Sequence, residues 1–434
     1  MSDYMFMLES HLNGDHNRVV NAVSALASEA SANVYLAGGA VRDMLAGCII
    51  RDLDFTLESQ VPDLARNLVG QLGGEIRYED PYERFTELVL PGGVTAQIAI
   101  AREEQYAKPG AKPRITAPVP IWADLKRRDF TVDGIALGLN RGSRGQLRDP
   151  NNGIADLQSR ELRASYSGIF SDDPSRMLRM IRLKHRLGFT VDERTTRQFE
   201  NARLEELQNL IPAEVRLEEL KQIAQEPLAG EILKDYRASG LMPLISAALD
   251  SDRLDIHGLE KLERLRKMIP QALFASAGTA GGGWLAFLDV LSAPLNAREK
   301  PELARNVGLD RRAADAIKKL PAEARKLESV LKSARMQKPS HVYFALEPAS
   351  ADLVLYLMYQ SQQRIVQDRI RNYLQKYLPA AQEATVDVTG AKARIEAITR
   401  KLNARPKKPV AGVVEAAAEP AAPAVVRGWS ARRS

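Results

Sequence analysis

A short segment near the N-terminus combines two adjacent glycines with two aspartates that are one residue apart, and it constrains the fold more than any other part of the chain. The apolar residues 34–37 predict a strand. Gly38 and Gly39 then allow a tight turn with close approach of the backbone. Residues 41–46 predict a short helix that ends at Gly47. The segment therefore predicts a strand, a glycine turn and a helix whose first N–H groups could receive a phosphate.

The two aspartates lie on the strand that is predicted next. Positions 53, 55 and 57 are apolar and alternate with polar residues, a pattern typical of a half-buried strand. Asp52 and Asp54 then share one face of this strand. Two neighbouring carboxylates repel each other unless a cation lies between them, and Mg²⁺ prefers oxygen ligands. This pair predicts a Mg²⁺ site, although the pair alone would fit the solvated face of an edge strand equally well.

The composition of the whole chain narrows the class of protein. It has 434 residues, enough for two to four structural units, and no stretch approaches 18 uninterrupted apolar residues. Because the N-terminus also lacks a signal pattern, we expect a cytoplasmic protein with no membrane partner. Its one cysteine, Cys48, excludes an internal disulfide and a cysteine-based zinc site. Of the formal net charge of +6, residues 401–434 carry +5 (seven Lys and Arg, two Glu), so an RNA-binding surface would need local basic clusters.

Strand and helix patterns alternate up to about residue 140, whereas helical patterns dominate from about residue 156 onward. Residues 87–90 and 94–101 predict a hairpin around a Pro-Gly-Gly turn. We therefore expect an α+β fold, in which a head with a small mixed sheet and helices precedes an all-helical remainder. The expected parts are an N-terminal helix within 1–32, the head at 33–155, helical domains at 156–250 and 251–380, and a disordered basic tail at 381–434.

Several motifs, taken in order, resemble the class II tRNA nucleotidyltransferase and bacterial poly(A) polymerase family. Gly-Gly-Ala-Val-Arg-Asp at 38–43 and Arg-Asp-Leu-Asp-Phe at 51–55 are similar to its active-site signature. Further matches lie at 101–113, 124–131 and 172–182, and the resemblance covers about residues 34–244. It implies a polymerase-β-like nucleotidyltransferase head, followed by a helical neck and RNA-binding body (156–250) and a helical tail domain (251–380).

The resemblance also implies roles for individual residues. Asp52 and Asp54 would be the catalytic residues and would hold two Mg²⁺ ions. Asp173 and Arg176 match the pair that reads the edge of the incoming base, which would suit A or C. The predicted nucleotide-binding residues are Gly38, Gly39, Arg42, Arg128, Asp173, Arg176, Arg179 and Arg182. Without the upstream motifs, a helix cap for Asp173 and a solvated face for the three arginines of residues 174–186 would be the better interpretation.

The chain departs from the family pattern at three places: Gln97 stands where an acid is usual, Val132-Asp133-Gly134 where Ile-Asn-Ala is usual, and Asp172 where Glu is usual. A glutamine can contact a metal but cannot act as a base. We expect a template-independent RNA nucleotidyltransferase that adds C and/or A to tRNA 3′ ends from CTP and ATP, with Mg²⁺ as cofactor. An A-adding enzyme, a poly(A) polymerase and a catalytically weak RNA-binding relative are the alternatives. A metal-dependent glycosyltransferase would leave Arg-Arg-Asp-Phe-Thr at 127–131 unexplained.

Overall fold

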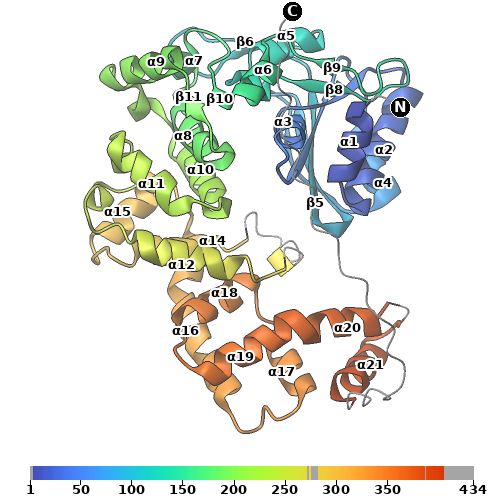
Figure 1. Cartoon of the computed structure of the whole chain (residues 1–434), viewed down its shortest axis with the longest axis vertical. Helices are drawn as coiled ribbons and strands as arrows, with labels where there is room; N and C mark the ends of the chain where they lie inside the picture. The colour runs from blue at the N-terminus through green and yellow to red at the C-terminus, as the bar shows by residue number, and fades with distance from the viewer. Residues whose placement is uncertain (1–2, 271–272, 275–281, 387, 405–434) are drawn as a thin grey trace, which may run out of the picture. The chain divides into compact units, whose positions relative to one another are not determined.

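The fold is taken from a computed structural model of the chain, which describes residues 3–270, 273–274, 282–386 and 388–404. The chain divides into two compact units, Met1–Pro379 and Ala380–Ser434. The first unit contains a mixed sheet and, C-terminal to it, a long series of helices (Figure 1). The predicted α+β class, with a sheet-containing head before an all-helical remainder, is therefore confirmed.

A seven-stranded sheet forms the framework of the head, with the order β3-β4-β5-β2-β1-β8-β9. Neighbours β2 and β5 are parallel, whereas the other neighbouring pairs are antiparallel. The strands are β1 (Val34–Ala37), β2 (Asp52–Leu57), β3 (Glu75–Asp80), β4 (Phe85–Leu90), β5 (Val94–Ile100), β8 (Ala136–Gly138) and β9 (Leu147–Arg148). Strands β4 and β5 form the predicted hairpin. Two smaller pairs join β6 (Glu103–Gln105) to β7 (Arg114–Thr116) and β10 (Glu161–Leu162) to β11 (Thr190–Val191).

The predicted strand, glycine turn, helix and second strand are all present at the centre of this sheet. All four residues of β1 are buried, so the strand lies in the core. Gly38 follows with φ of +67°, a left-handed conformation that favours glycine, and α3 (Gly39–Leu45) begins at the next residue. Strand β2 then returns antiparallel to β1. The turn and the aspartate pair are thus fixed by the two central strands of the head.

Further helices accompany the sheet. Figure 1 shows α1 (Asp3–His11), α2 (Gly14–Glu29) and α4 (Leu64–Leu72) grouped beside it. Helix α2 buries Val19, Val20, Val23 and Ala27, the spacing that one helical face requires. The predicted single N-terminal helix is therefore two helices, because Asn13 begins α2 by accepting a hydrogen bond from the backbone of His16. Helices α5 (Ile121–Lys126) and α6 (Gly153–Ser159) complete the head.

The rest of the first unit is helical. Helices α8, α10 and α11 pack together, and so do α14, α16 and α18. The elements are α7 (Ile169–Asp172), α8 (Arg176–Leu187), α9 (Glu193–Leu204), α10 (Ala213–Gln225), α11 (Ala229–Ala238), α12 (Ile256–Arg266), α14 (Trp284–Ser292), α15 (Glu299–Asn306), α16 (Arg311–Lys332), α17 (Pro339–Leu346), α18 (Ala351–Gln360) and α19 (Arg364–Asn372). The division of these helices into neck, body and tail stays a prediction. Among all described residues, no helix is both long enough and apolar enough to cross a membrane.

The C-terminal segment corrects one prediction. Residues 381–434 were expected to be disordered, but part of this segment is helical. The two helices are α20 (Leu378–Ala384) and α21 (Ala391–Asn403). Ile398 and Leu402 of α21 are buried, and Lys401 pairs with Glu383 at 3.2 Å. Two apolar residues four positions apart give this helix an apolar face that can be buried. The average composition of the whole segment does not reveal such a face. Residues 405–434 lie outside the described residues.

Candidate functional site

The two aspartates predicted as metal ligands lie on one face of β2. Asp52 is exposed and Asp54 is half-buried, whereas Leu53 between them is buried. Parallel pairing of β2 with β5 places Thr95 beside Asp52 and Gln97 beside Asp54. The Thr95 hydroxyl donates a hydrogen bond to an Asp52 carboxylate oxygen. Four side chains that carry oxygen therefore line two neighbouring strands at this point.

The glycine turn approaches these carboxylates closely. A Cβ atom on Gly38 would lie 2.5 Å from Nη1 of Arg128 and 3.8 Å from Oδ2 of Asp54. A Cβ on Gly39 would lie 3.6 Å from Nη2 of Arg42 and 3.9 Å from the same Asp54 oxygen. The absence of side chains at both positions therefore leaves a cradle bounded by one carboxylate and two guanidinium groups. Five of the predicted site residues are brought together here.

Arg128 is held in this cradle by an acid that the sequence did not single out. Its Nε and Nη2 atoms donate to Oδ2 of Asp124 at 3.2 and 3.0 Å, and Nη2 also lies 3.4 Å from the Thr56 hydroxyl. Asp124 is buried on α5, four residues before Arg128, and this spacing was the available signal. Asp129, the next residue along the chain, pairs with Arg179 at 2.5 Å.

A second buried acid joins two of the predicted nucleotide-binding arginines. Asp133 accepts from Nη1 of Arg42 at 2.5 Å and from Nη2 of Arg179 at 2.9 Å. Arg42 also pairs with Asp43 at 2.7 Å. Burial disfavours the charge on Asp133, but Arg42 and Arg179 outweigh burial and hold the pKa of that carboxyl well below its usual range. From the sequence, Asp133 was only a departure from the family pattern, and the structure makes it a link between α3 and α8.

The predicted base-reading pair lies at the start of α8. The Nε atom of Arg176 is 3.7 Å from Oδ2 of Asp173. The other oxygen of Asp173 accepts hydrogen bonds from the backbone N–H and the hydroxyl of Ser175, at 3.0 and 2.6 Å. Asp173 therefore stabilises the beginning of the helix and also contacts Arg176. Ser175, and not Asp173, is the N-cap of α8, and there is no side-chain cap hydrogen bond among the described residues, so Asp173 holds the turn before the helix and is not its cap.

Arg182 does not join the other predicted site residues. It is buried and pairs with Glu219 at 2.6 Å and with Glu226 at 3.5 Å, both on or directly after α10. Glu226 also pairs with Arg51 at 3.0 Å and with Arg186 at 3.4 Å. This network connects the residue before Asp52 to α8 and α10. A buried charge without its partner is costly, so Arg182 has a sufficient structural reason for its position.

The charge around Asp54 fits a bound cation. Burial, followed by the negative charge of Asp52, raises the pKa of Asp54 to about 6, although Arg128 and Arg179 act in the opposite direction. Two carboxylates, a hydroxyl and an amide are ligands that Mg²⁺ accepts. No group of three His, Cys, Asp or Glu side chains suited to a metal occurs among the described residues. A metal at this site would therefore depend on the aspartate pair together with oxygens from a nucleotide.

The raised pKa of Asp54 predicts an unusual pH dependence of stability. Between pH 4 and 6 the unfolded chain releases this proton while the folded protein keeps it, so the contribution of Asp54 to stability is lost as the pH rises through about 6. Asp54→Asn carries no such charge. In metal-free buffer, we expect the free energy of unfolding of the variant, relative to that of wild type, to be about 1–3 kcal/mol higher at pH 7.5 than at pH 4. Denaturant unfolding at both pH values measures this gain, and an equal difference at both would contradict it.

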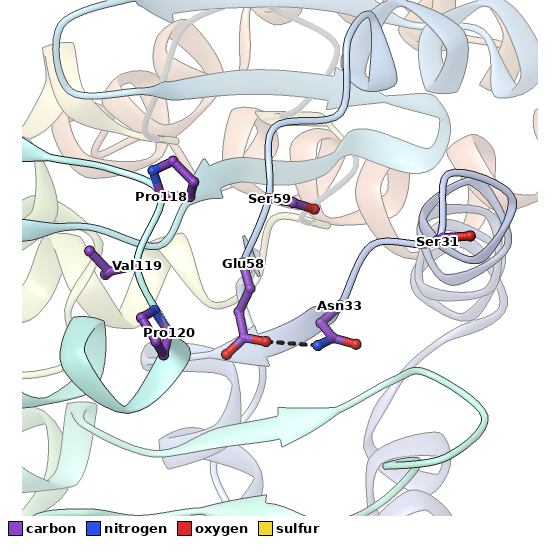
Figure 2. A pocket seen from close by; sticks show the side chains of 7 residues that line it. All are labelled: Ser31, Asn33, Glu58, Ser59, Pro118, Val119 and Pro120. Atoms are coloured by element: carbon purple, nitrogen blue, oxygen red, sulfur yellow. Dashed lines mark hydrogen bonds between the residues drawn. The ribbon is translucent and has the colours of Figure 1, made fainter.

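An open hollow elsewhere in the head does not belong to this site. It has a volume of about 410 Å³ and lies where the chain leaves β2, beyond the end of the strand that carries Asp52 (Figure 2). Glu58 accepts a hydrogen bond from Asn33 there at 2.8 Å. The lining residues are Ser31, Asn33, Glu58, Ser59, Pro118, Val119 and Pro120. None of the predicted site residues is among them, so we assign no part of the candidate site to this hollow.

The part of the chain that contains the sheet and the cradle is similar to a known domain. Residues 34–163 match the family model of the poly A polymerase head domain. The chain is 36% identical over 195 residues to an A-adding tRNA nucleotidyltransferase of Halalkalibacterium halodurans, covering 45% of each chain. It is 29% identical over 344 residues to that of Aquifex aeolicus, covering 79% of this chain and 40% of the relative. A solved CCA-adding enzyme in complex with CTP has a TM-score of 0.52 at 23% identity, covering 94% of this chain and 96% of that one.

Residues 34–163 therefore match the poly A polymerase head domain, in agreement with the resemblance seen in the sequence, and the chain is similar to two tRNA nucleotidyltransferases. The solved structure adds that the likeness of the fold extends over most of the chain. The chain spans less than half the length of the two curated relatives compared above.

Proposed function

We propose that this chain is a template-independent RNA nucleotidyltransferase that adds C and/or A to the 3′ end of tRNA from CTP and ATP. One observation carries the proposal: Asp52 and Asp54 share a strand face beside a glycine cradle that also meets Arg128. Transfer of a nucleotide requires carboxylates for metal ions, room for a triphosphate, and cationic donors for its charge. This one site offers all three.

Each side chain has a distinct part in the proposed reaction. Gly38 and Gly39 leave room for the triphosphate, and Arg42 and Arg128 supply donors to its oxygens. Asp124 and Asp133 keep these two guanidinium groups in place. Two Mg²⁺ ions held by Asp52 and Asp54 would, when bound, make the RNA 3′-hydroxyl more acidic and neutralise the charge of the leaving pyrophosphate.

Selection of the base is assigned to the start of α8. The carboxylate of Asp173 accepts from an exocyclic amine, and the guanidinium of Arg176 donates to a ring nitrogen or carbonyl oxygen. Adenine and cytosine both present an amine next to a ring acceptor, whereas guanine and uracil present a carbonyl in that place. Arg179 supports this helix through Asp129 and Asp133, and we give Arg182 a structural role in place of nucleotide contact.

The test of this proposal is Mg²⁺-dependent incorporation of labelled CTP or ATP into tRNAs that end before CCA, after C and after CC. We expect label in the RNA with Mg²⁺ and none with EDTA. The length of the product separates the alternatives, because an A-adding enzyme extends only a tRNA that already ends in CC, and a poly(A) polymerase adds many residues. The A-adding alternative is kept because both curated relatives carry that name. A protein that binds tRNA but never incorporates label would be the RNA-binding relative.

Gln97 offers a second test of the same site. Gln97→Glu would place a third carboxylate beside Asp54, as the register of β2 and β5 requires. We expect the Mg²⁺ concentration for half-maximal rate to fall several-fold, and the rate to rise if activation of the 3′-hydroxyl is limiting. General-base help can reach roughly 10²–10⁴-fold when its geometry is right, although a site adapted to glutamine will gain less. Glu87→Gln is the control, since Glu87 neighbours Gln97 on the other side, on β4. Identical Mg²⁺ titrations for Gln97→Glu and wild type would place Gln97 outside the metal site.

A further inference from the structure

The guanidinium group of Arg176 has a partner that none of the predicted roles includes. Its Nη1 atom donates a hydrogen bond to the hydroxyl of Tyr166 at 2.8 Å, and its Cζ atom lies 5.9 Å from the centre of the Tyr166 ring. Its other contacts are longer: Asp173 lies at 3.7 Å and the backbone oxygen of Arg127 at 3.5 Å. Tyr166 is therefore the nearest fixed group for this arginine.

The hydroxyl of Tyr166 is itself held in one orientation. It donates to Oδ2 of Asp172 at 2.9 Å, which turns a lone pair of the same oxygen toward Arg176. Burial is the main reason that the pKa of Tyr166 rises to about 12, so the hydroxyl keeps its proton at neutral pH. Asp172, Tyr166 and Arg176 thus form a chain of two hydrogen bonds with a defined direction.

The acid of the base-reading pair cannot fix Arg176 by itself. One oxygen of Asp173 is used by Ser175, and the other is 3.7 Å from Arg176, beyond ordinary hydrogen-bond distance. Arg176 is nevertheless buried, so it has few other ways to be held. An arginine that distinguishes bases by the direction of its N–H groups needs its plane to be fixed before the base arrives.

We propose that Tyr166 is a positioning residue that sets the choice of base, because it holds the plane of the Arg176 guanidinium through the chain from Asp172. This inference rests on the proposed function and deepens it. Tyr166 does not contact the base in this scheme. It fixes the direction in which Arg176 donates, so that the amine and ring acceptor of adenine or cytosine are favoured over the edge of guanine or uracil.

The test is Tyr166→Phe, which removes the hydroxyl and keeps the ring. The full chain is assayed for kcat/KM with each of the four nucleoside triphosphates on tRNAs that end before CCA, after C and after CC. We expect the preference for ATP and CTP over GTP and UTP to fall roughly tenfold, the size of one lost hydrogen bond to a charged group. The change should come from better use of GTP and UTP as well as higher KM for ATP and CTP.

Tyr236→Phe is the matched control. Tyr236 is buried and donates its hydroxyl to the backbone oxygen of Leu178 on the same helix α8, at 3.1 Å. The Tyr236→Phe variant therefore loses one hydrogen bond to α8 while the contacts of Arg176 stay unchanged. The base preference of this variant should equal that of wild type. Asp172→Ala provides a second route, since it removes the acceptor of the Tyr166 hydroxyl while leaving Tyr166 and α8 intact, and it should relax the preference in the same direction.

The outcomes separate this inference from the proposed function. If wild type incorporates CTP or ATP while Tyr166→Phe and Asp172→Ala keep the full base preference, the role of Tyr166 is overturned and the function stands. An equal loss of preference in Tyr236→Phe would also overturn it, because any loosening of α8 would then suffice. If wild type incorporates no nucleotide, the proposed function itself fails.

Discussion

Replacing Asp54 by alanine is expected to reduce nucleotide incorporation on the order of 10³-fold or more, the size seen when an essential catalytic group is removed. Asp54 is the carboxylate that faces the glycine cradle, and Asp52 lies two residues away on the same strand face. Loss of either would remove a proposed metal ligand without removing a core residue. Asp52→Ala should therefore behave similarly, and both variants should keep the melting temperature of wild type or exceed it at neutral pH.

Glu79→Ala provides the matched control for these variants. Glu79 is also an acid on a strand of the same sheet, but it is exposed on β3 and contacts Arg66 at 3.9 Å. Its loss should leave incorporation within about twofold of wild type, because an exposed ion pair contributes little. Near wild-type activity in Asp54→Ala would refute the assignment of the metal site to β2, and comparable losses in Glu79→Ala would point to a general effect on the sheet.

Gly38→Ala is expected to reduce kcat/KM by roughly 10²-fold or more, the size seen when one preorganised donor is lost. The added methyl would lie 2.5 Å from Nη1 of Arg128, so the guanidinium must leave the cradle. The left-handed backbone at Gly38 adds a strain of about 1 kcal/mol for any residue with a Cβ atom. Steady-state kinetics with CTP and ATP would measure the loss, which we expect chiefly in the use of the triphosphate.

Gly47→Ala separates the two causes. Gly47 lies two residues after the end of α3 and has φ of +69°. No atom lies within 4 Å of a Cβ atom added to it. Gly47 therefore shares the positive φ of Gly38 without contact with Arg128. We expect similar losses of thermal stability in both variants and near wild-type kinetics in Gly47→Ala. If Gly47→Ala were as inactive as Gly38→Ala, strain in the backbone and not crowding of the cradle would be the cause.

Local patterns in the sequence were sufficient for the centre of the head. The apolar run of β1, the glycine turn and the alternation on β2 are each contained within a few residues, and they predicted the strand face that Asp52 and Asp54 share. The partner strand was also predicted, because a Pro-Gly-Gly turn lies between β4 and β5. These local patterns could not predict the parallel register of β2 and β5, which places Gln97 beside Asp54.

Contacts between distant residues explain most of the remaining differences. Arg182 was placed with the nucleotide-binding arginines through the resemblance to the family, but its partners Glu219 and Glu226 come from residues far along the chain. The same holds for Asp133, which meets Arg42 across the head. Residues 131–138 form a 3₁₀ turn at Thr131–Asp133 followed by β8, and not one continuous strand. There the Thr131 hydroxyl bonds to Asp156, a tertiary contact that strand propensity does not contain.

Extension of a tRNA that lacks CCA, followed at single-nucleotide resolution, tests the proposed function most directly. The full chain is incubated with Mg²⁺ and labelled CTP and ATP, beside the Asp54→Ala variant and a tRNA whose 3′-hydroxyl is blocked. We predict products longer by one to three nucleotides with wild type, and no product with the variant or the blocked tRNA. Absence of labelled product with wild type on tRNAs ending before CCA, after C and after CC would contradict the assignment of this chain as a tRNA nucleotidyltransferase.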